Sequence, residues 1–156
     1  MMNQYKSDNL VEFSGTGLVV YKAGSVREIV PLYEEITRLI EDKDSLTEDA
    51  FRASVPIWFS RHFNPEGYIF RAESIHRETG LSFNAELEGK VFYRGDIEAW
   101  CDLVYDIDVK RPFLKYELLS DSMAVFYHDI PEFPCPLGDL EWALCVCGAD
   151  EVLTSY

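Results

Sequence analysis

Apolar residues along the N-terminal third of the chain first form short runs and then recur at the spacing of a helix. Two short apolar runs, 10–13 and 17–22, flank a turn-forming segment rich in Ser and Gly, and this pattern predicts two strands. After Ser25-x-x-Glu28, which has the form of a capping box, apolar residues return at spacings of three and four. A helix is therefore predicted after the second strand.

A second capping box, Ser45-x-x-Glu48, precedes another set of apolar residues at helical spacing. Pro56 lies within that set, and a proline inside a helix removes a backbone hydrogen bond. The sequence thus predicts a second helix that is bent or shortened at Pro56.

From Gly67 onward the pattern shifts toward alternation, which is typical of strands with one buried face. A short helix is predicted at 73–79. Turn-forming residues at Glu88-Gly89 and at 120–122 predict two tight hairpin loops. Runs rich in branched and aromatic residues predict strands at 68–72, 81–87, 90–93, 114–119 and 123–128.

The segment 100–109 fits two structures. As a strand it alternates cleanly and places Asp102, Asp106 and Asp108 on one face, which favours a half-buried antiparallel strand. As a helix it stacks Glu98, Asp102 and Asp106 at i,i+4, where like charges repel one another. In both structures one face presents several carboxylates and no internal cation.

The C-terminal part of the chain predicts one more helix. Three prolines make 130–136 stiff and extended, and Asp139 is placed to cap a helix over 140–147 that Gly148 ends. The whole pattern predicts a single α+β domain over 1–156, with 1–9 as a flexible tail. We expect N-terminal helices packed on an antiparallel β-sheet, a short C-terminal helix, and a second sheet face or edge that is acidic and partly open.

Charge is distributed in blocks along the chain. The 28 Asp and Glu residues outnumber the 14 Lys and Arg residues, which gives a formal net charge of −14. Residues 28–49 contain eight acidic and two basic residues, and 116–156 contain eight acidic residues and no Lys or Arg. Such a chain repels phosphate backbones and anionic membranes, so the charge argues against nucleic-acid or membrane binding and for a basic protein partner.

Other signals narrow the class of protein further. The first residues lack an apolar signal-peptide core and no apolar run could span a membrane, so we expect a cytoplasmic protein. The four cysteines are too few for a disulfide framework and are expected to be buried thiols. The histidines are scattered, and no phosphate loop or metal-ligand spacing is present, so we expect no cofactor and no metal.

A small, single-domain, acidic chain without catalytic motifs is similar to bacterial toxin-immunity proteins as a class, in composition and charge layout. The similarity implies a non-enzymatic inhibitor whose carboxylates occupy the basic cleft of a nuclease toxin, where opposite charges speed association. Carboxylates and one aromatic anchor in the C-terminal half are the predicted partner-binding residues. They are Asp102, Tyr105, Asp106, Asp108, Glu117, Asp121, Asp129 and Glu132.

An enzymatic alternative rests on Tyr105-Asp106-Ile107-Asp108-Val109. On a strand, this alternation resembles the metal-binding strand of the nucleotidyltransferase superfamily, in which two carboxylates on one face share divalent ions that orient a triphosphate. Glu117 is the candidate third carboxylate. The phosphate-binding glycine pair of that family is replaced upstream by Arg94-Gly95-Asp96.

Overall fold

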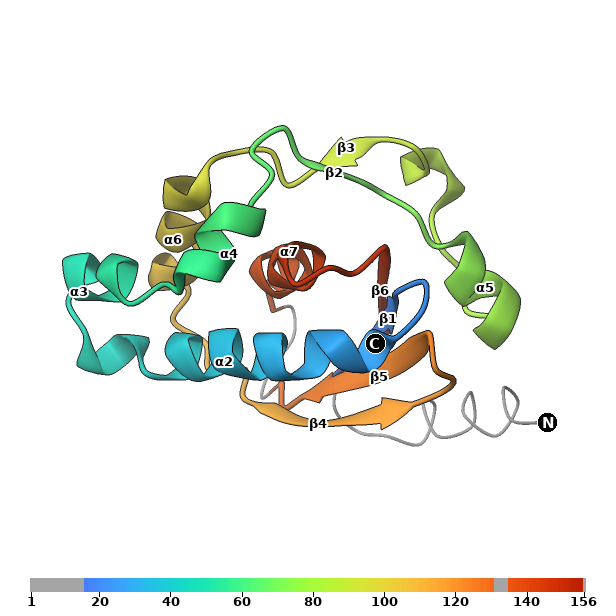
Figure 1. Ribbon diagram of the computed structural model, residues 1–156, viewed down its shortest axis with the longest axis horizontal. Coiled ribbons are helices and arrows are strands. Elements are labelled where there is room, and N and C mark those ends of the chain that lie inside the picture. Colours follow the sequence, from blue (N-terminus) through green and yellow to red (C-terminus); the bar gives the residue numbers. More distant parts are fainter. Residues whose placement is uncertain (1–15, 131–134, 156) are drawn as a thin grey trace.

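A four-stranded antiparallel sheet forms the centre of the protein (Figure 1). The computed structural model describes residues 16–130 and 135–155. Within them, the strand order is β4-β5-β1-β6. The strands are β1 (Thr16–Tyr21), β4 (Phe113–Leu118), β5 (Met123–His128) and β6 (Glu151–Ser155).

Helices surround this sheet, and a small second sheet pairs β2 (Tyr68–Ile69) with β3 (Val91–Phe92). No helix in the described part of the chain combines the length and apolarity that crossing a membrane requires. The α-helices and 3-10 turns (η) are η1 (Val26–Glu28), α2 (Ile29–Glu41), η2 (Lys43–Ser45), α3 (Glu48–Ala53), α4 (Ile57–His62), α5 (Glu73–Thr79), η3 (Ala85–Leu87), α6 (Ile97–Asp106) and α7 (Gly138–Val146).

The main core lies between one face of the sheet and helices α2, α6 and α7. Alternate residues of β1 and β5, such as Leu18 and Phe126, point into it and are fully buried. Trp100 of α6 is also fully buried there, against Phe51 and Phe59. Large aromatic side chains bury the most apolar area per residue, so this cluster anchors α6 and the short helices α3 and α4 to the domain.

The opposite face of the sheet is also packed. Val19, Val125 and Tyr127 are buried there, and Ile75 of α5 joins them. Of the expectation that a second sheet face or edge is acidic and partly open, the alternative of a face is therefore wrong. Alternation along β1 sends successive side chains to two buried faces, which explains why the strand reads as a continuous apolar run.

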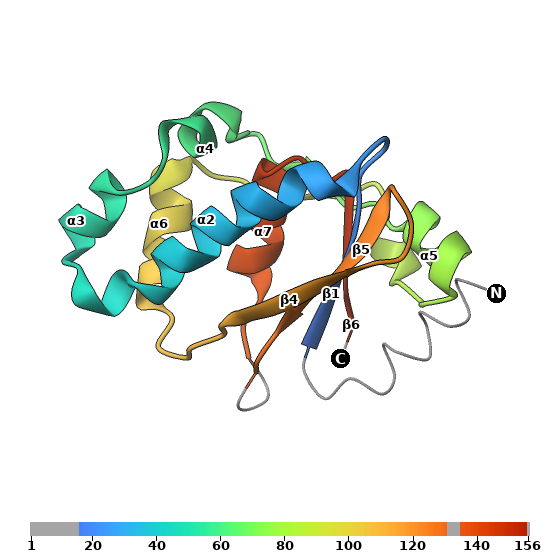
Figure 2. The ribbon, with the colours of Figure 1, turned by 60° about the horizontal axis from the view of Figure 1, so that its bottom comes forward.

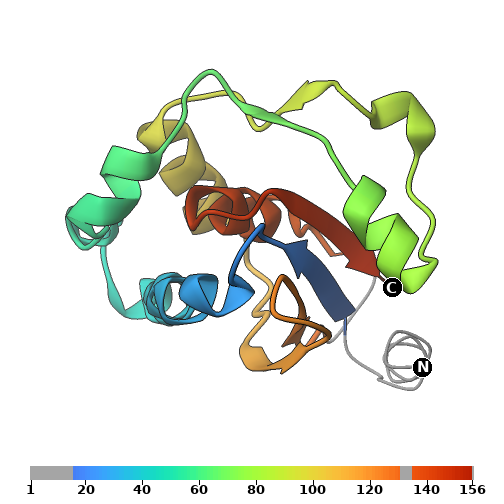
Figure 3. The ribbon, with the colours of Figure 1, turned by 45° about the vertical axis from the view of Figure 1, so that its right-hand side comes forward.

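Residues 64–96 form an arch over α7 (Figure 3). The arch carries the β2–β3 pair at its top and α5 at its end beside β6. The carboxylate of Glu151 accepts hydrogen bonds from the backbone N–H groups of Ser74 and Ile75, at 2.9 and 3.1 Å. This buried carboxylate attaches the first turn of α5 to the edge strand β6.

A buried polar network crosses the core between α7, β5 and α2. Arg111 and Asp139 form a two-pronged ion pair at 2.5 and 2.8 Å. His128 bonds through Nδ1 to the carbonyl oxygen of Arg111 at 2.7 Å and through Nε2 to the hydroxyl of Tyr33 at 2.7 Å. A carbonyl can only accept, so Nδ1 carries the proton and Nε2 accepts from Tyr33. The imidazole is therefore neutral with both nitrogens satisfied.

His128 should make stability depend on pH. Burial lowers the pKa of His128 from 6.5 to about 4. The unfolded chain then binds a proton that the folded chain excludes, so this stabilisation is complete above about pH 6.5 and is lost as the pH falls toward 4. Because of His128, the free energy of unfolding of the wild type should fall by about 2 kcal/mol between about pH 7 and about pH 5. We expect His128→Gln to abolish this part of the pH dependence, measured by urea unfolding. An unchanged pH dependence in the variant would contradict this assignment.

Many predicted elements are confirmed. Strands 17–22, 114–119 and 123–128 match β1, β4 and β5 to within a residue, and the turn at 120–122 joins the last two. The helix at 73–79 is α5, and Pro56 separates α3 from α4. The 68–72 and 90–93 predictions shrink to the two-residue strands β2 and β3.

One predicted strand and one predicted hairpin are wrong, and the segment with two open alternatives takes the helical one. Residues 81–87 are irregular and end in η3, where the side chain of Asn84 accepts a hydrogen bond from the N–H of Glu86. Glu88-Gly89 consequently closes no hairpin, although Gly89 has the predicted positive φ of 79°. The segment 100–109 is mostly helical, as α6, so the helical alternative is the one that forms.

The predicted caps are also partly wrong. Ser25 and Ser45 make no side-chain capping bond, whereas Thr47 caps α3 by accepting from the N–H of Ala50 at 3.1 Å. Asp139 lies inside α7 and binds Arg111 instead of capping the helix. The predicted tail at 1–9 and strand at 10–13, and most of the extended segment 130–136, lie outside the described residues.

Candidate functional site

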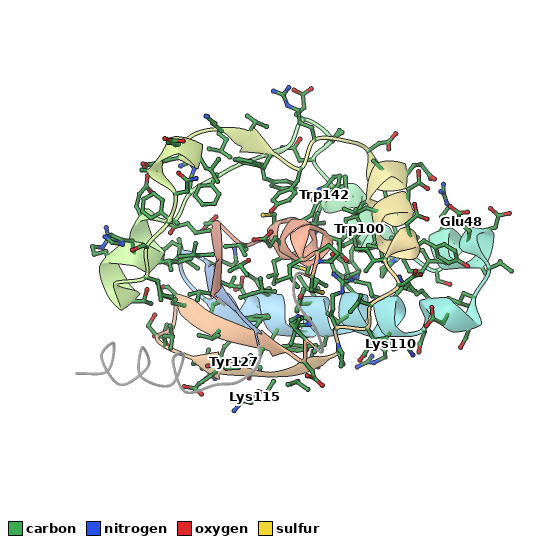
Figure 4. The ribbon with its side chains drawn as sticks, turned by 180° about the vertical axis from the view of Figure 1, so that it is seen from behind. Glu48, Trp100, Lys110, Lys115, Tyr127 and Trp142 are labelled. Atoms are coloured by element: carbon green, nitrogen blue, oxygen red, sulfur yellow. The ribbon has the colours of Figure 1, made fainter. Side chains whose placement is uncertain are left out.

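Carboxylates gather at one end of the molecule, where α3, α6 and the C-terminal end of α2 meet (Figures 1 and 4). We call this region the acidic pole and define it by residues 41–53 and 97–110. It contains nine acidic residues and three basic ones. The nine are Glu41, Asp42, Asp44, Glu48, Asp49, Glu98, Asp102, Asp106 and Asp108.

One arginine explains why the acidic stripe of the pole is helical. Arg52 of α3 donates hydrogen bonds to the carboxylates of Glu98 and Asp102 on α6, and to Glu48 one turn earlier on its own helix at 2.9 Å. The cation between Glu98 and Asp102 offsets the repulsion expected at i,i+4. At the N-terminus of α6, the carboxylate of Asp96 accepts from the N–H of Ala99 at 3.0 Å and caps the helix.

A buried lysine holds the other end of α6. The Nζ of Lys43 donates to the carbonyl oxygens of Val104, at 2.7 Å, and Ile107, and lies 3.5 Å from that of Tyr105. These carbonyls belong to the end of a helix, where the backbone lacks donors and the helix dipole favours a cation. Burial lowers the pKa of Lys43. The ammonium group of Lys43 thus hydrogen-bonds to the backbone and not to the carboxylates of the pole.

The outward surface of the pole combines acidic side chains with one apolar side chain. Asp49, Asp106 and Asp108 are exposed, and Leu103 of α6 is also exposed, with 40% of its surface accessible. Asp44 is partnered by Lys110 at 3.6 Å, and both side chains are mostly exposed. Exposed pairs of this kind are weak, so they leave the field of the pole strongly negative.

The predicted partner-binding residues do not form one surface. Asp102, Tyr105, Asp106 and Asp108 belong to the acidic pole, where the hydroxyl of Tyr105 donates to the carbonyl of Leu46 at 2.8 Å. Three others lie on the sheet, and Glu132 lies outside the described residues. Those three are Glu117 in β4, Asp121 in the β4–β5 turn and Asp129 just after β5.

The acidic C-terminal block, 116–156, is divided between the interior and the surface. Asp139 is 1% exposed and pairs with Arg111, and Glu151 is 6% exposed and binds the first turn of α5. Glu141 accepts hydrogen bonds from the hydroxyls of Tyr93 and Thr154, at 2.7 and 2.6 Å. These carboxylates serve the fold. The sequence suggests that Asp139, Glu141, Asp150 and Glu151 lie on an exposed rim. Asp150 is exposed as suggested, whereas Asp139 and Glu151 are buried and Glu141 is partly buried.

The described residues do not form the strand that the metal-dependent alternative requires. Asp106 is the last residue of a helix and Asp108 follows it, so the strand on which the nucleotidyltransferase resemblance depends is not formed. Among residues 16–130 and 135–155, no three His, Cys, Asp or Glu side chains gather in a way that could hold a metal ion.

Burial raises the pKa of cysteine thiols in this protein and does not activate them as nucleophiles. None of the four forms a disulfide bond, as predicted, and three are buried. Burial raises the pKa of Cys101 to about 11 and that of Cys145 to about 12. Because the thiolate is the nucleophile, these two side chains are inert near neutral pH.

Comparisons of this chain with protein-family models, with curated proteins and with solved structures find no match.

Proposed function

We propose that this chain is a binding protein that neutralises a basic protein partner, of the kind represented by bacterial nuclease toxins, and that the acidic pole is its binding surface. The observation that carries the proposal is the gathering of nine carboxylates with three cations. Two of those cations, Lys43 and Arg52, are already engaged within the fold. A nuclease cleft is basic because it binds phosphates, and carboxylates can occupy the same positions.

The surface of α6 suits this role. Carboxylates at every fourth residue lie about 6 Å apart along a helix axis. Leu103 lies among them as an apolar side chain that a partner could cover. Opposite charges steer association, while a covered apolar centre slows dissociation. The carboxylates would therefore raise the rate of association, and contacts around Leu103 would slow dissociation of the complex.

The test is affinity capture with the full chain, followed by kinetics and nuclease assays on the purified captured protein. A pole variant, Asp49→Lys with Asp106→Lys and Asp108→Lys, should slow association by about ten-fold or more at low salt. The control variant is Glu86→Lys with Asp121→Lys and Asp129→Lys. It makes the same charge change away from the pole and includes two residues of the sequence-based prediction.

The two variants separate local from general electrostatics. The proposal requires that the control keeps nearly wild-type association and inhibition while the pole variant loses both. Equal losses in the two variants would mean that net charge alone matters, and would remove the pole as the binding surface. Capture of no basic protein, or inhibition that is unaffected in the pole variant, would overturn the proposed function.

A further inference from the structure

Strand β4 forms one edge of the central sheet (Figure 2). Within the described residues it pairs with β5 alone. Leu114 is 53% exposed and Tyr116 is 39% exposed, although both are large apolar side chains on a strand. An edge that presents apolar side chains and backbone hydrogen-bonding groups is a template for another strand.

The register of the β4–β5 hairpin shows which backbone groups of β4 point outward. The N–H of Leu119 donates to the carbonyl of Met123 at 2.8 Å, so these two residues form a hydrogen-bonded pair. Such pairs alternate with non-bonded pairs along an antiparallel ladder. Glu117 and Lys115 therefore bond toward β5, and the N–H and C=O groups of Tyr116 and Leu118 point away from the sheet.

The sequence of β4 is complementary to itself around Tyr116. In an antiparallel pair of two β4 strands centred on Tyr116, Lys115 of each copy lies opposite Glu117 of the other. Leu114 likewise lies opposite Leu118. Directly opposed residues on one face interact, and opposite charges there are favourable while like charges are not. The outward backbone groups of Tyr116 also match, because a residue on the two-fold axis must exchange both hydrogen bonds with its own copy.

We propose that β4 is a self-association edge, at which a second copy of this chain adds its own β4 in antiparallel orientation. The two four-stranded sheets then become one continuous eight-stranded sheet. The two-fold axis is perpendicular to the sheet, so both copies of α2 lie on the same face. This arrangement is an isologous interface, in which one patch meets its own copy.

The described residues leave a groove beside β4. This groove of about 440 Å³ lies between α2 and β4 and is lined by Leu114, Tyr116 and the mixed charges of Glu34, Arg38 and Glu41. In Figure 4, Lys115 lies at the outer margin of the sheet, and its Nζ is 5.4 Å from the ring centre of Tyr127. A bulge between Phe113 and Lys115 interrupts the strand and limits the pairing to 114–118.

A charge exchange tests this pairing with the full chain. Lys115→Glu alone places Glu opposite Glu, and Glu117→Lys alone places Lys opposite Lys, so each variant should dimerise about ten-fold more weakly than wild type. An equimolar mixture of the two should form a heterodimer, because each Glu then lies opposite a Lys. Sedimentation equilibrium at an ionic strength of about 0.15 M, where the Debye length is about 8 Å, screens the repulsion between acidic copies.

Each outcome decides the proposal. Wild-type dimers that weaken in both single variants and return in the mixture support it, with circular dichroism confirming that all proteins are folded. Tyr116→Pro, which removes an outward N–H while keeping the ladder to β5, should also give monomers. A wild-type protein that stays monomeric into the millimolar range, or a mixture that does not dimerise better than its components, would overturn the pairing. The pairing would also be overturned if β4 bound an extended partner peptide while the protein itself stayed monomeric.

Discussion

Replacing Asp139 by Ala is expected to lower the free energy of unfolding by about 3–5 kcal/mol. The guanidinium of Arg111, whose side chain is 2% exposed, would lose both carboxylate bonds and keep one to the carbonyl of Pro136 at 2.9 Å. Within the described part of the chain, its Nε has no hydrogen-bond partner even with Asp139 present. A buried cation that loses its counter-ion cannot recover solvation, so the loss reflects an uncompensated charge. Urea unfolding followed by circular dichroism measures the change.

Two further variants show that burial is the cause. In Asp44→Ala, which removes the exposed partner of Lys110, the change should stay within about 1 kcal/mol. The double replacement Arg111→Met with Asp139→Leu should recover much of the loss, since apolar groups of similar size need no partner. If Asp139→Ala alone lowered the free energy of unfolding by less than about 1 kcal/mol, Arg111 would not be left as an uncompensated buried charge, and our description of the pair would be wrong.

Lys43→Met is expected to lower the free energy of unfolding by about 3 kcal/mol, because it removes two charged hydrogen bonds from buried carbonyls. The carbonyls of Val104 and Ile107 would then have no donor from η2, and the last turn of α6 would open more readily. Amide hydrogen exchange measures this locally. Protection should fall most over 101–108 and least over β1 and β5, where the ladder is unchanged.

Lys110→Met is the matched control for that experiment. Lys110 is also a lysine of the acidic pole, but its side chain is 74% exposed and it pairs with Asp44 on the surface. Its replacement should leave exchange in α6 within the error of wild type. If the two variants change exchange equally, Lys43 acts as a surface charge and not as a buried cap.

Local pattern predicted three of the four strands of the central sheet, whereas β6 was not predicted. In β4 and β5 the branched and aromatic residues and the turn residues between them favour the same structure, so tertiary contacts had nothing to override. At α6 they disagree. The clean alternation of 101–109 favours a strand, and the outcome depends on Arg52, which is distant in sequence and neutralises the pair Glu98 and Asp102. No local pattern contains that contact.

The candidate site was predicted in part for a similar reason. The run containing Asp102, Asp106 and Asp108 does lie on the surface, since exposed carboxylates need no partner to stay solvated. The more acidic C-terminal block looked equally exposed in sequence, yet Asp139 and Glu151 are inside. Net charge counts both kinds alike, and the partners that separate them, Arg111 and the backbone of α5, come from distant parts of the chain.

Because Lys43 and Arg52 hold α6 in place, a partner that binds at the acidic pole should cause little loss of conformational entropy in this helix. A surface that must order itself on contact loses conformational freedom at that moment, and this loss weakens the complex. Here the helix is fixed at its start by Asp96 and Arg52 and at its end by Lys43 before a partner arrives. Only the outermost rotamers of side chains such as Asp106 remain to be ordered. Binding at this surface should therefore proceed with the helix already in its final geometry.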